Sequence, residues 1–194
     1  MMTNSKNILA TVILILAAAV ISIIYLKPNN SLQPVKLGGE FQGESIDGDV
    51  SLSDFKGKLV LLYFGYTSCP DICPTSLTTM KFALNELDDD QLAQIQPIFY
   101  SVDPERDSLQ QLQIYSQFFS PLILGMTGSR QQIDNAIKQY GAYYRMVDQP
   151  DSAMGYTVDH SSKIYLIDQQ GEFLGTVSHN NPNQLVEKIH SILK

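Results

Sequence analysis

The feature that most constrains the fold is a continuous apolar run of strand length, KLVLLYFGY, from Lys58 to Tyr66. Apolar residues at nearly every position suit a strand that is buried on both faces. QPIFYSVD, from Gln96 to Asp103, is a second such run, and Leu122–Met126 is a short third one. Stretches of helical periodicity separate these runs, which predicts a mixed sheet flanked by helices, an α/β fold.

The expected helices begin with recognisable start signals. Pro74 opens the first helix, where its missing N–H would have had no partner in any case. Ser108–Phe119 and Ser129–Tyr140 each begin with a serine followed three residues later by glutamine, which is a capping-box pattern. We expect a hairpin over Lys163–Val177 and a last helix that starts at Asn181-Pro182.

The N-terminus carries an uncharged stretch, ILATVILILAAAVISIIYL, of nineteen residues from Ile8 to Leu26. About 20 apolar residues span a bilayer as a helix, so we expect residues 1–27 to form an N-terminal transmembrane anchor. A cleaved signal peptide is the alternative, since Ala17-Ala18-Ala19 resembles a cleavage site. The apolar VISIIYL that follows would make a poor mature N-terminus, which favours the uncleaved anchor.

Residues 28–38 are rich in proline, asparagine and glycine and read as a tether to a folded domain at residues 39–194. The net charge of −7 argues against nucleic acid as a partner. The short N-terminal tail contains no arginine, unlike a mitochondrial transit peptide, so a bacterial inner membrane is the expected location.

The chain has only two cysteines, Cys69 and Cys73, in the segment TSCPDICPTSL directly after the first buried strand. Sites in α/β sheets gather at such strand–helix junctions. A cysteine at a helix N-terminus is stabilised as a thiolate by backbone N–H groups and the helix dipole. Residues spaced as i and i+4 share a face of a helix, so both sulfurs can reach one ion or each other.

Several chemistries fit this pair. A structural disulfide would close a very small loop and contribute little stability. A structural zinc site requires four ligands, and two cysteines alone do not supply them. A haem-attachment motif has histidine directly after its second cysteine, where this chain has Pro74. Thiol redox chemistry and a copper site remain, the latter with an imidazole as third ligand. Of the three histidines, His160 is flanked by Asp159, which could orient its ring, but the spacing alone leaves open a merely exposed loop histidine.

Three blocks, in order, resemble the SCO/SenC family of copper proteins, which assist cytochrome c oxidase assembly. KLVLLYFGYTSCPDICPTSL matches the family's strand and C-P-x-x-C-P segment. SVDPERDS matches its V-D-P-x-R-D segment, and VDHSSKIYLID matches its V-D-H-S block and the strand that follows. The resemblance covers residues 39–194. It implies a thioredoxin-like mixed sheet flanked by helices, attached to a single membrane anchor.

By the same resemblance, Cys69, Cys73 and His160 are the copper ligands, with the two cysteines also available for thiol chemistry. Asp159 is implied only as a candidate partner of the histidine ring. Asp71, inside the cysteine motif, is expected to tune the site or to cap the helix.

The acidic and basic residues of the second block are expected to be structural, linking a strand end to a helix cap: Asp103, Arg106 and Asp107. The family likeness also suggests a function. The chain would be a copper metallochaperone that delivers copper to the binuclear copper centre of cytochrome c oxidase, with the soluble domain in the periplasm. Its partners would be the copper-bearing oxidase subunit and other periplasmic copper chaperones.

Three other functions compete with this one. A thiol–disulfide oxidoreductase that reduces cysteines of the target, or of another copper chaperone, would need the two cysteines but not His160. A peroxiredoxin-like peroxidase is disfavoured, because Tyr66 stands where that family places threonine. A copper sensor that acts through a partner kinase is the fourth hypothesis.

Overall fold

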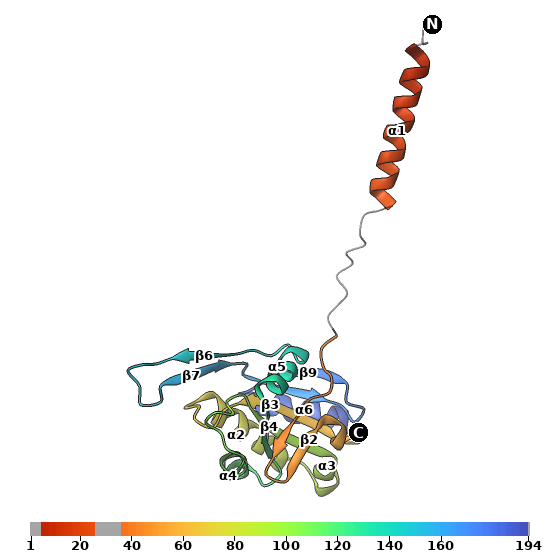
Figure 1. The fold of residues 1–194 in the computed structure, drawn as a ribbon. Helices are drawn as coiled ribbons and strands as arrows, with labels where there is room; N and C mark the ends of the chain where they lie inside the picture. Colours follow the sequence, from red (N-terminus) through yellow and green to blue (C-terminus); the bar gives the residue numbers. More distant parts are fainter. Residues whose placement is uncertain (1–4, 26–35, 194) are drawn as a thin grey trace. The chain divides into compact units, whose positions relative to one another are not determined.

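The structure is a computed structural model that describes residues 5–25 and 36–193 (Figure 1). The chain divides into two units, residues 1–36 and residues 37–194. The first contains the helix α1 (Ser5–Tyr25). Among the described residues, no helix is long and apolar enough to cross a membrane, so the expected anchor stays a prediction. Most of the expected tether, up to residue 35, lies outside the described residues.

The second unit is built on a seven-stranded sheet with the strand order β2-β1-β5-β4-β3-β8-β9. β3, β4 and β5 run parallel, whereas β1 pairs antiparallel with β5, and β8 pairs antiparallel with β3. The sheet is therefore mixed, as the sequence predicts. Its strands are β1 (Gln42–Ser45), β2 (Gly48–Ser51), β3 (Leu59–Gly65), β4 (Ile95–Ser101), β5 (Leu124–Thr127), β8 (Lys163–Ile167) and β9 (Phe173–Ser178).

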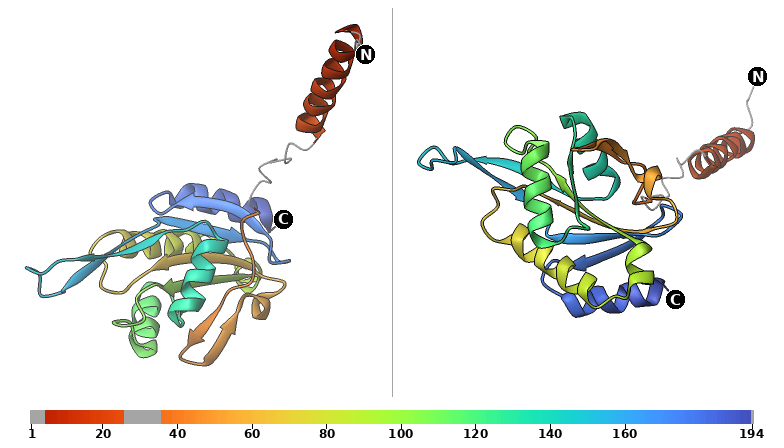
Figure 2. Two further views of the ribbon diagram at one scale, coloured as in Figure 1. Left: turned by 45° about the horizontal axis from the view of Figure 1, so that its top comes forward. Right: turned by 90° about the horizontal axis from the view of Figure 1, so that it is seen from below.

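Helices cover both faces of this sheet. Figure 2 shows α2 and α6 side by side on one face and α5 on the other. The capping boxes expected at Ser108 and Ser129 are both formed. The helix that was expected to open at Pro74 begins two residues earlier, at Ile72, so Pro74 lies in its first turn but not at its first position. The helical elements are η1 (Leu52–Phe55), α2 (Ile72–Asn85), α3 (Asp89–Ala93), α4 (Leu109–Phe119), α5 (Arg130–Gln139) and α6 (Pro182–Ile192).

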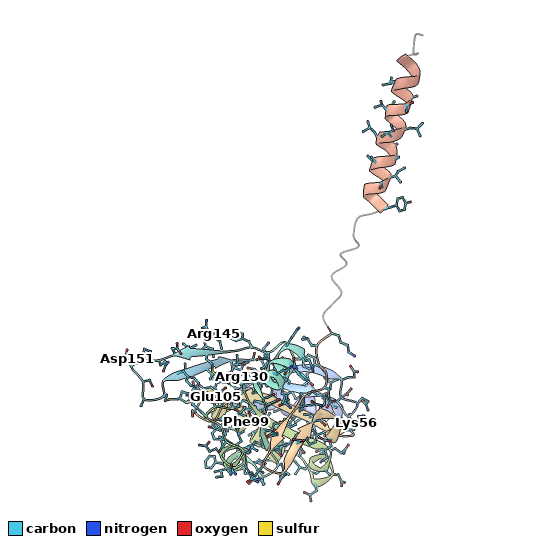
Figure 3. All side chains as sticks on the ribbon, in the orientation of Figure 1. Lys56, Phe99, Glu105, Arg130, Arg145 and Asp151 are labelled. Carbon is cyan, nitrogen blue, oxygen red and sulfur yellow. The ribbon has the colours of Figure 1, made fainter. Side chains whose placement is uncertain are left out.

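The core lies along the central strands. Every residue of β3 is buried, as a continuous apolar run predicts. Large aromatic side chains fill both faces of the central strands, and four of them are fully buried: Tyr63, Phe64, Phe99 and Tyr100. Figure 3 shows Phe99 in the interior of the sheet domain, with Lys56 and Arg145 at its surface. Because β3 and β4 are parallel, they end at the same edge of a rigid sheet, and the residues after them meet there.

The structure contains two hairpins that the sequence analysis did not predict. One is β1–β2, at the edge of the main sheet. The other is β6 (Tyr144–Asp148) paired with β7 (Tyr156–His160), a separate two-stranded sheet that projects beside the main one (Figure 1). His160 was expected in a loop before the hairpin at Lys163, but it is the last residue of β7. The first pair is almost entirely polar, and the second mixes polar and apolar residues without a regular period, so neither has a clear strand pattern in the sequence.

Removing the cap of α5 should destabilise the sheet domain modestly. The Ser129 side chain accepts a hydrogen bond from the backbone N–H of Gln132, which has no partner within the helix. We expect Ser129→Ala to lower the free energy of unfolding by about 1 kcal/mol. Ser191→Ala, at an exposed position in the last turn of α6, is the control and should change it by much less. Equal effects in urea denaturation would contradict the capping role.

Candidate metal centre

The two cysteines lie where β3 gives way to α2. Cys69 is in the connecting loop, and its backbone N–H donates to the Tyr66 carbonyl at 3.3 Å. Cys73 is in the first turn of α2, and its backbone N–H donates to the Cys69 sulfur at 3.4 Å. Both are free thiols, and both are buried, with exposed fractions of 9% and 0%. The N-terminus of α2 therefore donates a hydrogen bond to the Cys69 sulfur, and the Cys73 side chain belongs to the same turn.

Gly65, the last residue of β3, makes room for this arrangement. A Cβ atom built at this position would lie 2.7 Å from the Cys73 sulfur and 2.8 Å from the Phe99 ring. Neither neighbour is free to move, because both are fully buried. The sequence analysis did not single out this residue. A glycine at the end of an otherwise apolar strand was the available signal, since it often marks a close approach.

His160 reaches the cysteines from the end of β7. Its Nε2 lies 3.3 Å from the Cys73 sulfur, and its Nδ1 lies 3.1 Å from the Ser161 carbonyl oxygen. A carbonyl only accepts, so Nδ1 carries a proton and Nε2 is the ring nitrogen that faces the sulfur. The rings of Tyr63 and Tyr66 stand edge-on to the imidazole, at centroid distances of 6.0 and 5.6 Å, and hold its plane.

The structure thus brings all three sequence-predicted site residues together. The Cys69, Cys73 and His160 ligand atoms lie within 4.8 Å of one another. Within the described part of the chain, this is the single group of three or more His, Cys, Asp or Glu side chains close enough to hold an ion. Two sulfurs and one imidazole nitrogen suit a soft ion such as Cu(I) and are one ligand short of a structural zinc site.

Asp159 does not contact the histidine ring, for which the resemblance implied it as a candidate partner. The Asp159 carboxylate pairs with Arg145 at 2.8 Å, and both side chains are largely exposed. The ring is oriented by the Ser161 carbonyl instead, because β7 alternates its side chains and turns Asp159 away from His160. Asp71 occupies the N-cap position of α2 but makes no side-chain cap. Its carbonyl accepts from Thr75, and its backbone N–H donates to the Cys69 sulfur.

The two thiols differ in their readiness to ionise. The Cys73 thiol donates to the Cys69 sulfur and, with further hydrogen bonds from His160 and the backbone, holds the pKa of Cys69 well below its usual range, at about 3. Burial raises the pKa of Cys73, and the neighbouring thiolate raises it further. Such a pair titrates as a unit, in which Cys69 ionises first and Cys73 keeps its proton to higher pH. A metal cation would displace that proton.

The SCO1/SenC family model matches residues 29–194 of this chain. The chain belongs to the SCO1/SenC family. A mitochondrial SCO2 protein of Saccharomyces cerevisiae is 38% identical over 163 residues, which are 83% of this chain and 54% of the yeast protein. The chain therefore spans about half the length of that relative.

Solved SCO structures share the fold. Copper-bound ScoI of Bradyrhizobium japonicum is 34% identical with a TM-score of 0.72, over 80% of this chain and 99% of that one. BsSco, described as having a disulfide switch and as a member of the Sco family of cytochrome c oxidase assembly proteins, is 25% identical with a TM-score of 0.62, over 82% and 95% of the two chains. These matches confirm the mixed α/β, thioredoxin-like fold that the resemblance implied.

The unequal thiols give a testable order of reaction. At pH 6, iodoacetamide should label Cys69 well before Cys73, since only Cys69 is a thiolate there and the thiolate is the nucleophile. The rate at Cys69 should stay level from pH 7 down to pH 5, because its pKa lies below that window. Peptide mass spectrometry after timed quenching measures both. In the urea-unfolded chain the two should react at similar rates; preferential labelling of Cys73 in the folded chain would contradict the assignment.

Proposed function

We propose that this chain is a membrane-anchored copper-binding protein that delivers copper to, or prepares the thiols of, the binuclear copper centre of cytochrome c oxidase. Cys69, Cys73 and His160 bind the ion. The observation that carries the proposal is the convergence of their two sulfurs and one imidazole nitrogen within 4.8 Å. Membership of a family with copper-bound structures supports the choice of metal.

The site suits an ion that has to be passed on. Three ligands leave a coordination position for an incoming donor, so copper can transfer by ligand exchange without ever being free. Cys69 is slightly exposed and Cys73 is fully buried, which makes Cys69 the ligand nearer to a recipient. The recipient would be the copper-bearing subunit of the oxidase, and other periplasmic copper chaperones would supply the ion.

Thiol–disulfide exchange is the second candidate function, favoured by the lowered pKa of Cys69 beside a protonated Cys73. The Cys69 thiolate would attack one sulfur of a target disulfide and displace the other as a thiolate. Cys73, on losing its proton, would then attack the mixed disulfide. The target leaves as a dithiol, and the two electrons that it gains come from the Cys69 and Cys73 thiols, which are oxidised to a disulfide. That disulfide cannot bind copper, so the two functions exclude each other at any moment.

The proposed location follows from the N-terminus. Residues 1–27 would form a single uncleaved anchor in a bacterial inner membrane, residues 28–38 a tether, and residues 39–194 the domain in the periplasm. The uncharged run from Ile8 to Leu26 supports the anchor. A tethered site would stay close to an oxidase embedded in the same membrane.

Copper stoichiometry tests the proposal. The full chain in detergent, with its thiols reduced, should hold one copper ion and show sulfur-to-copper charge-transfer absorption in the Cu(II) form. His160→Ala should lose most of this copper, because it removes one of the three donors of the site, while disulfide exchange at Cys69 and Cys73 continues.

His190→Ala is the matched control. His190 is an exposed histidine on α6 whose Nδ1 contacts Gln91 at 3.2 Å, away from the cysteines. This variant should bind copper as the unchanged chain does. If the unchanged chain binds no copper tightly while its cysteines cycle to a disulfide, the delivery function is wrong and the oxidoreductase remains.

A further inference from the structure

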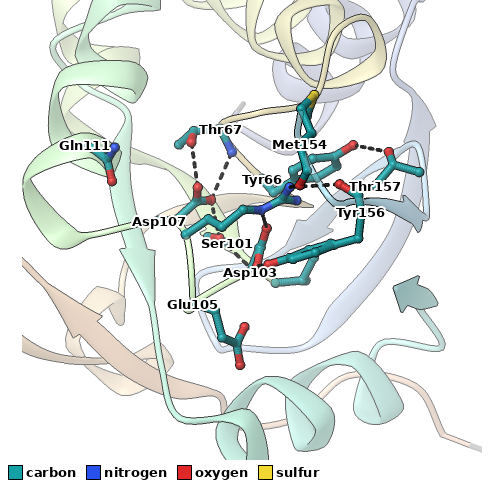
Figure 4. Close-up of polar contacts among 12 residues, drawn as sticks. Tyr66, Thr67, Ser101, Asp103, Glu105, Asp107, Gln111, Met154, Tyr156 and Thr157 are labelled. Carbon is teal, nitrogen blue, oxygen red and sulfur yellow. Dashed lines mark hydrogen bonds and ion pairs between the residues drawn. The ribbon is translucent and has the colours of Figure 1, made fainter. Parts of the chain in front are cut away.

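The loop between β4 and α4, residues Asp103–Asp107, contacts both halves of the metal centre. It has the sequence DPERD, and its charged residues are expected from the sequence to link a strand end to a helix cap. They do form that turn, since the backbone N–H groups of Arg106 and Asp107 donate to the Asp103 carbonyl. Figure 4 shows that their side chains also reach outward, to the hairpin on one side and to the cysteine loop on the other.

Arg106 holds the start of β7. Its Nε donates to the Asp103 carboxylate at 2.5 Å, and its Nη1 donates to the Tyr156 carbonyl at 2.9 Å and to the Met154 carbonyl at 3.4 Å. Its guanidinium carbon lies 3.7 Å from the centroid of the Tyr156 ring. The planar guanidinium thus binds the backbone of the hairpin and stacks on the first side chain of β7, geometry that lysine cannot reproduce.

Asp103 binds both Arg106 and Tyr156. Its carboxylate is fully buried and accepts from the Tyr156 hydroxyl at 2.7 Å as well as from Arg106. Asp103, Arg106 and Tyr156 therefore form a closed ring of contacts between the main sheet and the hairpin. Charged hydrogen bonds are stronger and more directional than neutral ones, especially where water is excluded.

The hairpin needs such a contact to hold His160 in place. β6 and β7 pair only with each other and are not part of the seven-stranded sheet. An isolated two-stranded hairpin is marginally stable in water, so its orientation comes from side-chain contacts with the rest of the domain. Tyr156 and His160 are the first and last residues of the five-residue strand β7, so fixing the first of them fixes where the second points.

Asp107 holds the other half of the site. It is 1% exposed, and its carboxylate accepts from the Thr67 backbone N–H at 2.9 Å and from the Thr67 hydroxyl at 2.5 Å. The Ser101 hydroxyl at the end of β4 donates to the same carboxylate at 2.6 Å. Thr67 lies two residues before Cys69, so these bonds tie the cysteine loop to the end of the neighbouring strand.

Tyr66, in the cysteine loop, contacts the strand β7 that ends at His160. Its hydroxyl lies 2.9 Å from the Thr157 hydroxyl on β7, and its ring stands edge-on to the His160 imidazole. Tyr66, which precedes Thr67, thus contacts Thr157, which follows Tyr156. Each half of the site is held by the loop and also by the other half.

We propose that the Asp103–Asp107 loop is a positioning element for the metal centre, in which Arg106 with Asp103 sets the place of His160 and Asp107 sets the place of Cys69. The inference rests on the proposed copper-binding function. Two buried carboxylates, Asp103 and Asp107, and the half-buried Arg106 thus align ligands from two separate segments, beyond stabilising the domain. None of the three touches the ion.

A double-mutant cycle on the full chain tests the Arg106 half. We expect Arg106→Ala to weaken Cu(I) affinity roughly 10–100-fold, as is usual when a residue that orients a ligand is removed. If Arg106 acts through His160, then Arg106→Ala should cause no further loss in the His160→Ala background. Arg106→Lys keeps the positive charge but not the planar grip, so it should resemble the alanine variant. Competition with a Cu(I) chelator measures all four.

A control variant and a variant of the other half of the loop separate positioning from general destabilisation. Lys56→Ala removes an exposed positive charge from the far side of the domain and should leave affinity unchanged (Figure 3). Asp107→Asn should weaken affinity in the His160→Ala background as strongly as in the unchanged chain, because it acts on the cysteine loop. It should also shift the reduction potential of the Cys69–Cys73 pair, which Arg106→Ala should leave in place.

Amide hydrogen exchange in the metal-free chain gives a readout that does not depend on copper. Arg106→Ala should speed exchange at the amides of β7 and leave those of β3 unchanged. Unchanged exchange in β7, or copper losses that add up in the double variant, would overturn the proposal. Failure of His160→Ala to release copper would overturn the proposed function instead, and exchange in β7 would still decide whether Arg106 holds the hairpin.

Discussion

The metal centre depends on one close approach, that of the Cys73 sulfur to the His160 Nε2 at 3.3 Å. The two residues are 87 positions apart in the chain, and they belong to elements that do not pair with each other. Cys73 is fixed by the N-terminus of α2, with Gly65 leaving the space that its sulfur fills. His160 is fixed by a hairpin outside the main sheet. Everything that brings these two elements together therefore acts on the site.

The proposed copper-binding and thiol-exchange functions both depend on the protons of the two cysteines. In the metal-free state one charge sits on Cys69, stabilised by the Cys73 thiol and by hydrogen bonds from the ring and the backbone. A bare pair of thiolates would be costly in this buried setting, so the second proton stays on until an ion replaces it. Binding of Cu(I) would release that proton and neutralise part of the charge. Oxidation would instead remove both sulfurs from the donor set.

The sequence predicts the main sheet well and the site only in part. The run Lys58–Tyr66 predicts a doubly buried strand, because it is apolar at nearly every position, of strand length and rich in aromatic residues, and the Ser129 capping box marks the start of its helix. The hairpin ending at His160 was missed, since its mixed residues carry no strong period and its place comes from Arg106 in a distant loop. Residue spacing alone left His160 undecided; only the family resemblance selected it. The contact of Asp159 with Arg145 likewise depends on which way β7 faces.

X-ray absorption at the copper edge of the loaded full chain tests the central claim most directly, because it identifies the atoms bound to the ion. The account predicts a first shell of two sulfur atoms and one imidazole nitrogen, with the imidazole signal lost in His160→Ala and retained in His190→Ala. A shell of sulfur alone in the unchanged chain, or an imidazole signal that survives in His160→Ala, would contradict it.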